Sequence, residues 1–186
     1  MKISFVACLF LLFAQYSHAQ GNAVDYKNLA LMEEGMKDDS RAILFGTEPS
    51  DRVAADSIFT RKFVQALKVT NSFYYPFDSL ITISKLYAPD STFRIFTWNL
   101  IIHENSVRQH GAIQMRTADG SLKLFPLIDK SDIIENKWDT VANNYGWVGA
   151  VYYKIIKKEI NGEPIYTLLG FDENNIRSNI KMIDVL

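Results

Sequence analysis

The sequence has 186 residues, of which 48 % are hydrophobic and 22 % are charged, and its formal net charge at pH 7 is −1. A chain of this length can fold around one hydrophobic core without a disulfide or a structural metal. The near-neutral charge argues against a nucleic-acid partner, because nucleic-acid-binding proteins carry clusters of Lys and Arg.

Residues 1–19 have the features of a secretory signal peptide. Lys2 precedes an apolar run over residues 3–14, and Ser17-His18-Ala19 places small residues beside a cleavage site. The apolar run is shorter than the roughly 20 residues that a membrane-spanning helix needs. The alternatives are an N-terminal anchor or a buried helix. We expect a periplasmic or secreted protein, with one domain over residues 20–186.

Cys8 is the only cysteine, and cleavage after Ala19 removes it. It lies in the middle of the apolar run rather than at its end, which argues against a lipoprotein. The remaining 167 residues carry 19 basic and 21 acidic side chains. The mature chain is therefore predicted to lack disulfides, thiol nucleophiles and thiolate metal sites. No later segment is long and apolar enough to be expected to span a membrane.

Two amphipathic helices are predicted before residue 70. The first lies within residues 22–45, where apolar residues recur every three or four positions, and a bend or an end is expected at 37–39. After Pro49, Ser50 is the predicted N-cap of the second helix, with Asp51 in its first turn. Its apolar residues fall on one face, which we expect to close the core.

From Leu80 onward the apolar periodicity changes to 2, and turn signals come at short intervals. Asp119-Gly120 and Asn161-Gly162 are hairpin signals, of which the second is the stronger because both positions tolerate positive φ. A polar loop with a short helical turn is expected over 130–145. About seven strands are predicted, as an antiparallel meander: 80–87, 93–102, 109–117, 122–128, 148–160, 164–171 and 180–186.

The segment 93–102 is the predicted central strand. Alternate side chains of a strand point to opposite faces, so Phe96, Trp98, Leu100 and Ile102 share one face. The other face carries residues 93, 95, 97, 99 and 101. Both rows are largely apolar, which indicates a strand covered on two sides, with the helices over part of one face.

Several phrases of the strand region resemble those of a group of exported bacterial proteins with no assigned activity. The likeness covers roughly residues 73–186. Members of that group tend to be longer, with more strand-rich sequence, so the resemblance implies that this domain is the N-terminal part of a longer architecture. It implies no functional residues. The phrases are Tyr75–Leu80, Leu86–Asp90, Phe93–Asn99, Gly149–Lys154 and Tyr166–Asp172.

His103 and His110 are the two histidines after residue 19, and they flank the expected reversal at 104–108. In a symmetric hairpin they would lie opposite each other, and with Glu104 they could hold zinc or copper. A third ligand is not fixed by this spacing, and such residues are ordinary near a turn. We therefore predict no metal site and no cofactor.

Carboxylates gather in the polar loop and at the last turn. A glycosidase-like acid–base pair needs two carboxyl groups at a defined separation, which the spacing does not impose. The run 172–175 offers oxygen ligands for calcium but lacks the full loop pattern with a closing glutamate. The sequence contains no Gly-x-Ser-x-Gly nucleophile elbow, no glycine-rich phosphate-binding loop and no His-Glu-x-x-His zinc-binding helix. These acids are Asp129, Asp132, Glu135, Asp139, Asp172 and Glu173.

Aromatic residues are concentrated in the strand region, where they either form cross-strand core pairs or bind a ligand. Trp138, Tyr145 and Trp147 are the predicted ligand-binding residues, because the Gly and Asn residues around them indicate an exposed loop. Stacking on sugar rings or on an apolar ligand is the chemistry that such side chains support.

These observations predict an α+β domain, with N-terminal helices packed on an antiparallel β-meander of about seven strands. The predicted function is an exported, non-catalytic binding or structural module for a glycan, a peptide or an envelope component. The alternative is a periplasmic or secreted hydrolase that acts on envelope polymers through the loop carboxylates. A third possibility is a fragment of a longer protein without an independent role.

Overall fold

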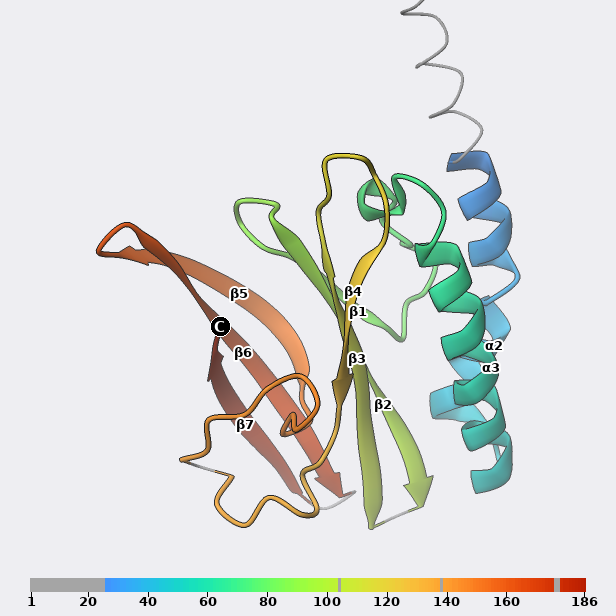
Figure 1. The fold of residues 1–186 in the computed structure, drawn as a ribbon. Helices are drawn as coiled ribbons and strands as arrows, with labels where there is room; N and C mark the ends of the chain where they lie inside the picture. The colour runs from blue at the N-terminus through green and yellow to red at the C-terminus, as the bar shows by residue number, and fades with distance from the viewer. Residues whose placement is uncertain (1–25, 104, 138, 176–177) are drawn as a thin grey trace, which may run out of the picture.

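The structure is a computed structural model that describes residues 26–103, 105–137, 139–175 and 178–186. Helices, a four-stranded sheet and a three-stranded sheet form three successive layers (Figure 1). Residues 26–34 are also helical. The remaining elements are α2 (Lys37–Phe45), α3 (Pro49–Leu67), the 3₁₀ turn η1 (Ser72–Tyr74), β1 (Ser84–Tyr87), β2 (Phe93–His103), β3 (Ser106–Met115), β4 (Lys123–Ile128), β5 (Val151–Ile160), β6 (Glu163–Asn175) and β7 (Ser178–Val185).

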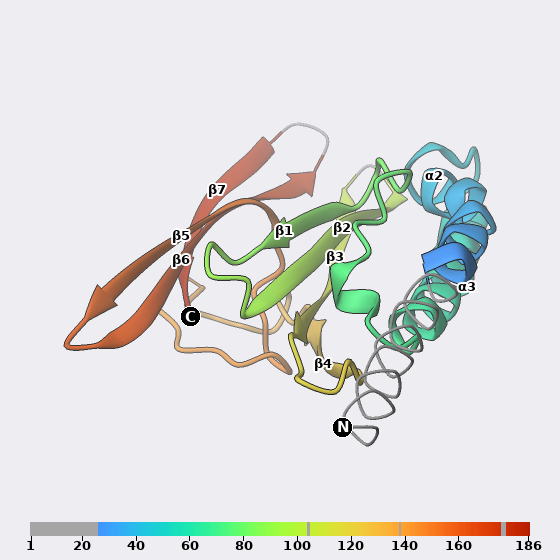
Figure 2. The ribbon, with the colours of Figure 1, turned by 90° about the horizontal axis from the view of Figure 1, so that it is seen from above.

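The predicted α+β class, with helices before seven antiparallel strands, is confirmed. The strands follow one another as a meander, but they divide into two sheets, in the orders β1-β2-β3-β4 and β5-β6-β7. Viewed from above, the second sheet lies on the side of the first that faces away from the helices (Figure 2). The irregular segment between β4 and β5 makes the crossing from one sheet to the other.

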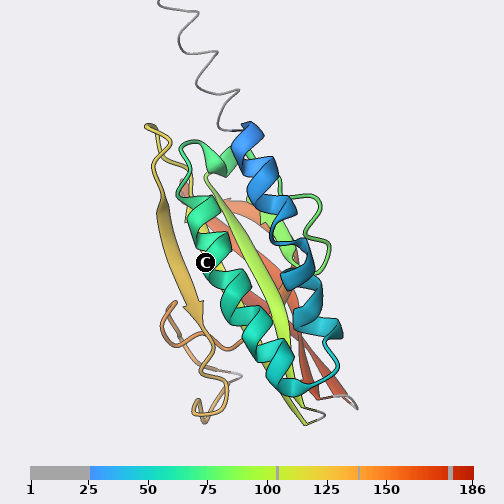
Figure 3. The same ribbon diagram turned by 90° about the vertical axis from the view of Figure 1, so that its right-hand side faces the viewer.

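The helical layer differs from the prediction in two local details. The bend expected at 37–39 lies at Gly35-Met36, and Lys37 already belongs to α2. The predicted N-cap at Ser50 is wrong, because Glu48 occupies that position and Pro49 takes the first helical turn. Proline suits the start of a helix since its missing N–H would have no partner there. Figure 3 shows these helices lying across the face of the first sheet.

The central strand β2 is covered on both faces, as predicted. Toward the helices, Phe96 and Trp98 pack edge-on against Phe63. Toward the second sheet, Phe93 packs against Tyr166 with their ring centroids 4.8 Å apart. Residues 93–100 are all buried, and each large apolar side chain contributes about 1.5–3 kcal/mol through removal from water.

One cation is buried within this sheet. The Arg94 side chain is 1 % exposed and donates hydrogen bonds to the carbonyls of Ser72 and Tyr75 and to the Gln114 side chain. Its guanidinium also lies 4.6 Å from the centre of the Phe96 ring. Burial lowers the pKa of Arg94 to about 10, so the group stays charged at neutral pH, and it fastens the segment 72–75 to the sheet.

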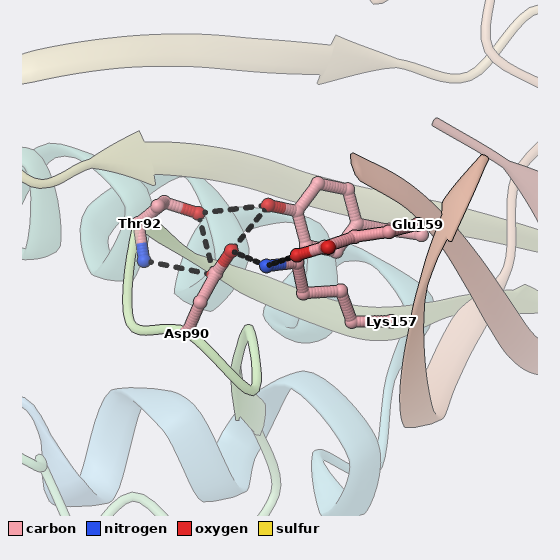
Figure 4. Close-up of polar contacts among 5 residues, drawn as sticks. Asp90, Thr92, Lys157 and Glu159 are labelled. Carbon is pink, nitrogen blue, oxygen red and sulfur yellow. Dashed lines mark hydrogen bonds and ion pairs between the residues drawn. The ribbon is translucent and has the colours of Figure 1, made fainter. Parts of the chain in front are cut away.

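The two sheets are joined by polar contacts at the turn between β1 and β2. The Asp90 carboxylate accepts hydrogen bonds from the Tyr166 hydroxyl, at 2.6 Å, and from the Thr92 hydroxyl, at 2.7 Å. Lys157 of β5 lies 3.2 Å from the same carboxylate (Figure 4). These bonds hold the pKa of Asp90 well below its usual range, the Tyr166 hydroxyl having the largest effect. We call Asp90, Thr92, Lys157 and Tyr166 the Asp90 clamp.

The hairpin between β5 and β6 turns as predicted. Asn161 and Gly162 both have positive φ, at 56° and 84°, which fits the twist of a two-residue hairpin. Within the described ranges, no helix is long and apolar enough to cross a membrane.

Candidate functional site

A cavity of about 420 Å³ lies beside the second sheet. One wall comes from β3 and β4, one from residues 140–144 of the connection between the sheets, and one from the last residues of β7. The floor is formed by Trp147, Tyr152 and Leu168, which belong to the core between the sheets. Ligand sites are usually apolar concavities of this kind with a few polar groups, which makes this cavity the candidate site.

Three polar side chains of the lining form a hydrogen-bonded chain. The Trp147 indole N–H donates to the Tyr152 hydroxyl at 2.8 Å, and that hydroxyl donates to Asp184 Oδ2 at 2.5 Å. Burial, together with the neighbouring Asp184 carboxylate, raises the pKa of Tyr152 far above its ordinary value of 10.0. The phenol is therefore a neutral donor, and its hydrogen bond orients the carboxylate at the cavity wall.

The structure does not bring the three predicted ligand-binding residues together in one site. Trp147 lines the cavity but is 6 % exposed, so the expectation that it lies exposed on a loop is wrong. Tyr145 is 67 % exposed and is not part of the lining. Trp138 lies outside the described residues. A ligand role for these three side chains stays a prediction.

Sequence reasoning missed the contribution of β5 and β7 to this cavity. Tyr152 and Asp184 come from these strands, together with Ile183 and Val185. A weak signal was present, since Tyr152 and Tyr153 are adjacent and must point to opposite faces of a strand. Tyr152 is 2 % exposed and Tyr153 is 50 % exposed.

A smaller cavity of about 110 Å³ lies next to the first, beside β7. The two cavities share Lys137, Val148, Ile183 and Asp184 in their linings. The smaller one adds Asp172 and Lys181. Together they follow β7 over most of its length.

The loop carboxylates are partly brought together. Gln109 joins two of them, because its backbone N–H donates to Asp129 at 3.1 Å and its side-chain amide donates to Asp172 at 2.6 Å. Asp172 is 7 % exposed. Burial raises the pKa of Asp172, the Gln109 hydrogen bond opposes that rise, and the nearby Asp129 charge adds to it.

The other carboxylates of this group stay at the surface. Asp132 is ion-paired with Arg108, while Glu135 and Asp139 are exposed. Gly149 packs directly on Gln109 and Asp129, and a Cβ there would lie 2.4 Å from the Gln109 side-chain oxygen and 2.9 Å from Asp129. The backbone of the connection thus lies against Gln109 and Asp129.

The predicted pairing of the two histidines is wrong. His103 lies opposite Ser106, and His110 lies opposite Trp98. The reason is that the β2–β3 hairpin turns directly after His103 rather than midway between the two histidines, and that the register shifts between Ile101 and His103. His110 Nδ1 instead lies 2.9 Å from Asp56 Oδ1, which also accepts the Trp98 indole N–H at 2.8 Å. In the part of the chain that is described, no group of three or more His, Cys, Asp or Glu residues is arranged to hold a metal ion.

A second cavity of about 420 Å³ lies beside β3 and β4. Its lining includes Arg108 and Asp132, which pair with each other, together with His110 and Lys130. The pairing of Arg108 with Asp132 occupies two of its charged side chains, which makes it a weaker candidate than the cavity beside the second sheet.

Comparison with protein-family models, with curated proteins and with solved structures finds no match to this chain.

Proposed function

We propose that this protein is an exported, non-catalytic binding module that holds an apolar or amphipathic ligand in the cavity beside the second sheet. The observation that carries this proposal is a cavity of about 420 Å³ whose lining residues are mostly apolar. Such a volume suits a small ligand or a few side chains of a larger one.

The polar groups of the cavity favour binding over catalysis. Trp147, Tyr152 and Asp184 satisfy one another by hydrogen bonds. General acid–base catalysis works best with groups whose pKa lies near the working pH. The pKa of Tyr152 is raised away from neutrality, so its hydroxyl is suited to positioning a carboxylate rather than to transferring a proton.

Ligand capture can be tested with a variant that fills the mouth of the cavity. Ala142 is exposed and lines it, so Ala142→Trp should leave the fold intact and exclude ligands. The measurement is thermal-shift screening against glycans, peptides and 8-anilinonaphthalene-1-sulfonate (ANS). Compounds that stabilise the wild type and Ala142→Ser, but not Ala142→Trp, support the proposal. The absence of any stabilising compound, together with hydrolysis of a model substrate, would overturn it.

A hydrolase that acts through Asp129 and Asp172 is the second candidate. It is favoured by the joining of these two carboxylates through Gln109 and by the raised pKa of Asp172. Asp129→Asn and Asp172→Asn separate the two functions. Loss of turnover on an envelope polymer with an unchanged melting temperature would favour the hydrolase, and no turnover in the wild type would favour the binding module.

Export rests on residues 1–19, whose charged start, apolar run and small-residue ending are typical of a signal peptide. Expression of the full chain in a bacterium with an envelope should yield a product whose mass corresponds to a start at Gln20. Recovery of the uncleaved chain from the cytoplasm would contradict this part of the proposal.

A further inference from the structure

Among the residues that the structure describes, no strand pairs with the edge of β7 that faces away from β6, and we call this the open edge of β7. The backbone of Leu186 exchanges two hydrogen bonds with Tyr166, at 2.9 and 3.0 Å. In an antiparallel pair, hydrogen-bonded and non-hydrogen-bonded positions alternate. The register runs without a shift from Thr167↔Val185 to Asp172↔Ile180, so residues 180, 182, 184 and 186 bond to β6.

The intervening residues therefore direct their backbone groups outward. Lys181, Ile183 and Val185 each present one N–H and one C=O on the open edge. Among the described residues, no backbone hydrogen bond joins these three residues to another segment. The open edge thus carries donors and acceptors at the spacing of a β-strand.

The outer edges of β5 and β4 are each contacted by a neighbouring segment at particular positions. β5 meets β1, where the Ser84 hydroxyl donates to the carbonyl of Tyr152 at 2.5 Å. β4 is met by the connection, since its Ile128 N–H donates to the Asn144 carbonyl at 2.8 Å. β4 also contains Pro126, which has no N–H to offer.

The two neighbouring cavities are both lined by residues of the open edge. Ile183 and Val185 line the larger one and Lys181 and Ile183 the smaller. Ile183 is 72 % exposed and Val185 is 65 % exposed. A row of unpaired backbone groups beside an apolar hollow is the arrangement by which extended peptides add a strand to a sheet.

We propose that the open edge of β7 binds an extended peptide segment, which becomes a fourth strand of the β5–β7 sheet. This inference rests on the proposed binding function and names its ligand class. The backbone of the peptide pairs with Lys181, Ile183 and Val185, and its side chains on one face enter the cavity floored by Trp147. A sugar or a lipid lacks the alternating amide groups that this edge requires.

The side chains of β7 also define a preferred peptide sequence. Directly opposite residues of paired strands lie on the same face, about 4.5–5.5 Å apart between Cβ atoms. Ile183 and Val185 favour apolar, β-branched partners, and Lys181 favours an acidic one. The preferred ligand is therefore an extended segment with two alternating apolar residues and a carboxylate two positions beyond them.

Amide hydrogen exchange provides the direct test, because it reads each backbone N–H separately. In the free protein, the amides of residues 182 and 184 should be protected and those of 181, 183 and 185 should exchange quickly. The probe is a peptide selected from a displayed library of random segments about ten residues long, which matches the length of long strands. Binding of the selected peptide should protect residues 181, 183 and 185.

A proline variant removes one outward donor without touching the bonds to β6. Ile183→Pro should weaken peptide binding by about tenfold or more, since one hydrogen bond and the local pairing are lost. Ile183→Val keeps the N–H and should bind within about twofold of the wild type. If Ile183→Pro does not fold, Val185→Pro removes the next outward N–H nearer the end of the strand.

Three outcomes would overturn the peptide proposal. The library selection could enrich no peptide, or the proline and valine variants could bind the selected peptide equally well. In the free protein, the amides of residues 181, 183 and 185 could be protected from exchange at high protein concentration and lose this protection on dilution. The last result would assign the edge to a second copy of the chain. Binding of ANS that Ala142→Trp abolishes, without peptide binding, would leave the proposed function standing and refute only this inference.

Discussion

The two faces of β2 are packed in different ways. Toward the helices, the aromatic rings of Phe59, Phe63 and Trp98 contact one another, and their centroids are 5.3 to 6.4 Å apart. Toward the second sheet, apolar side chains alternate with hydrogen-bonded polar groups such as Thr97, whose hydroxyl accepts the backbone N–H of Tyr152 at 3.1 Å. The larger apolar cavity also lies on this second side.

This difference indicates that the two faces of β2 have different roles. The helix side forms the larger buried cluster, and it is expected to contribute most of the stability. The second-sheet side is held by fewer ring contacts and by directed hydrogen bonds, which fix positions without filling all the space. A cavity on the second-sheet side can persist because the other side of β2 stabilises the domain.

The largest expected effect on stability comes from truncating an aromatic side chain on the helix side of β2. Phe63→Ala should lower the free energy of unfolding by about 4–5 kcal/mol, because Phe63 is 2 % exposed and its ring contacts four aromatic neighbours. Phe93→Ala is the matched change on the second-sheet side and should cost nearer to 3 kcal/mol. Urea unfolding of both variants measures the difference, and an equal or inverted ranking would break the comparison.

An intermediate effect is expected from the hydrogen-bonded chain at the cavity floor. Tyr152→Phe leaves the Trp147 indole and Asp184 without their partner and should cost about 1–2 kcal/mol. Tyr153→Phe is the control from the adjacent, exposed position and should change the stability by less than about 0.5 kcal/mol. Thermal unfolding measures both variants, and equal melting temperatures would contradict this account.

The smallest effects concern two carboxylates at opposite ends of the interface between the sheets. The pKa of Asp90 is lowered, so its stabilising contribution is complete above its unfolded value of about 4 and is lost as the pH falls toward its folded pKa. Asp90→Asn should cost about 1 kcal/mol at pH 7 and progressively less in acid.

Asp172 should behave in the opposite way, because burial raises its pKa. Its folded state binds a proton more tightly than the unfolded chain, so the stability falls as the pH rises from about 4 through the raised pKa. Asp172→Asn should remove that fall without loss of stability at pH 7. Urea midpoints between pH 3 and pH 8 test both variants, and parallel profiles would contradict the assignment.

Features that depend on neighbouring residues were predictable from the sequence. The largely apolar side chains on both faces of 93–102 predicted a strand covered on two sides. Asn161-Gly162 predicted the hairpin because both residues adopt positive φ. The helix start was missed at Ser50, since a polar cap and an N1 proline compete for the same turn and the proline at position 49 prevailed.

Features that depend on distant residues were not predictable. The separation of His103 from His110 follows from where the hairpin turns and from a register shift next to His103, which composition does not encode. The division into two sheets depends on where β4 stops pairing. Trp147 lies in a Gly- and Asn-rich segment that suggests exposure, yet its indole finds a partner in Tyr152, five residues away on a strand.

The buried guanidinium of Arg94 has a consequence for how the molecule opens. One cation bonds to the segment 72–75 and, through Gln114, to β3, so neither can detach without leaving a desolvated charge partly unbonded. These stretches should therefore fluctuate as one cooperative unit. We expect the amides of these stretches to share one opening free energy in hydrogen exchange, and this value should be higher than that of the β7 edge.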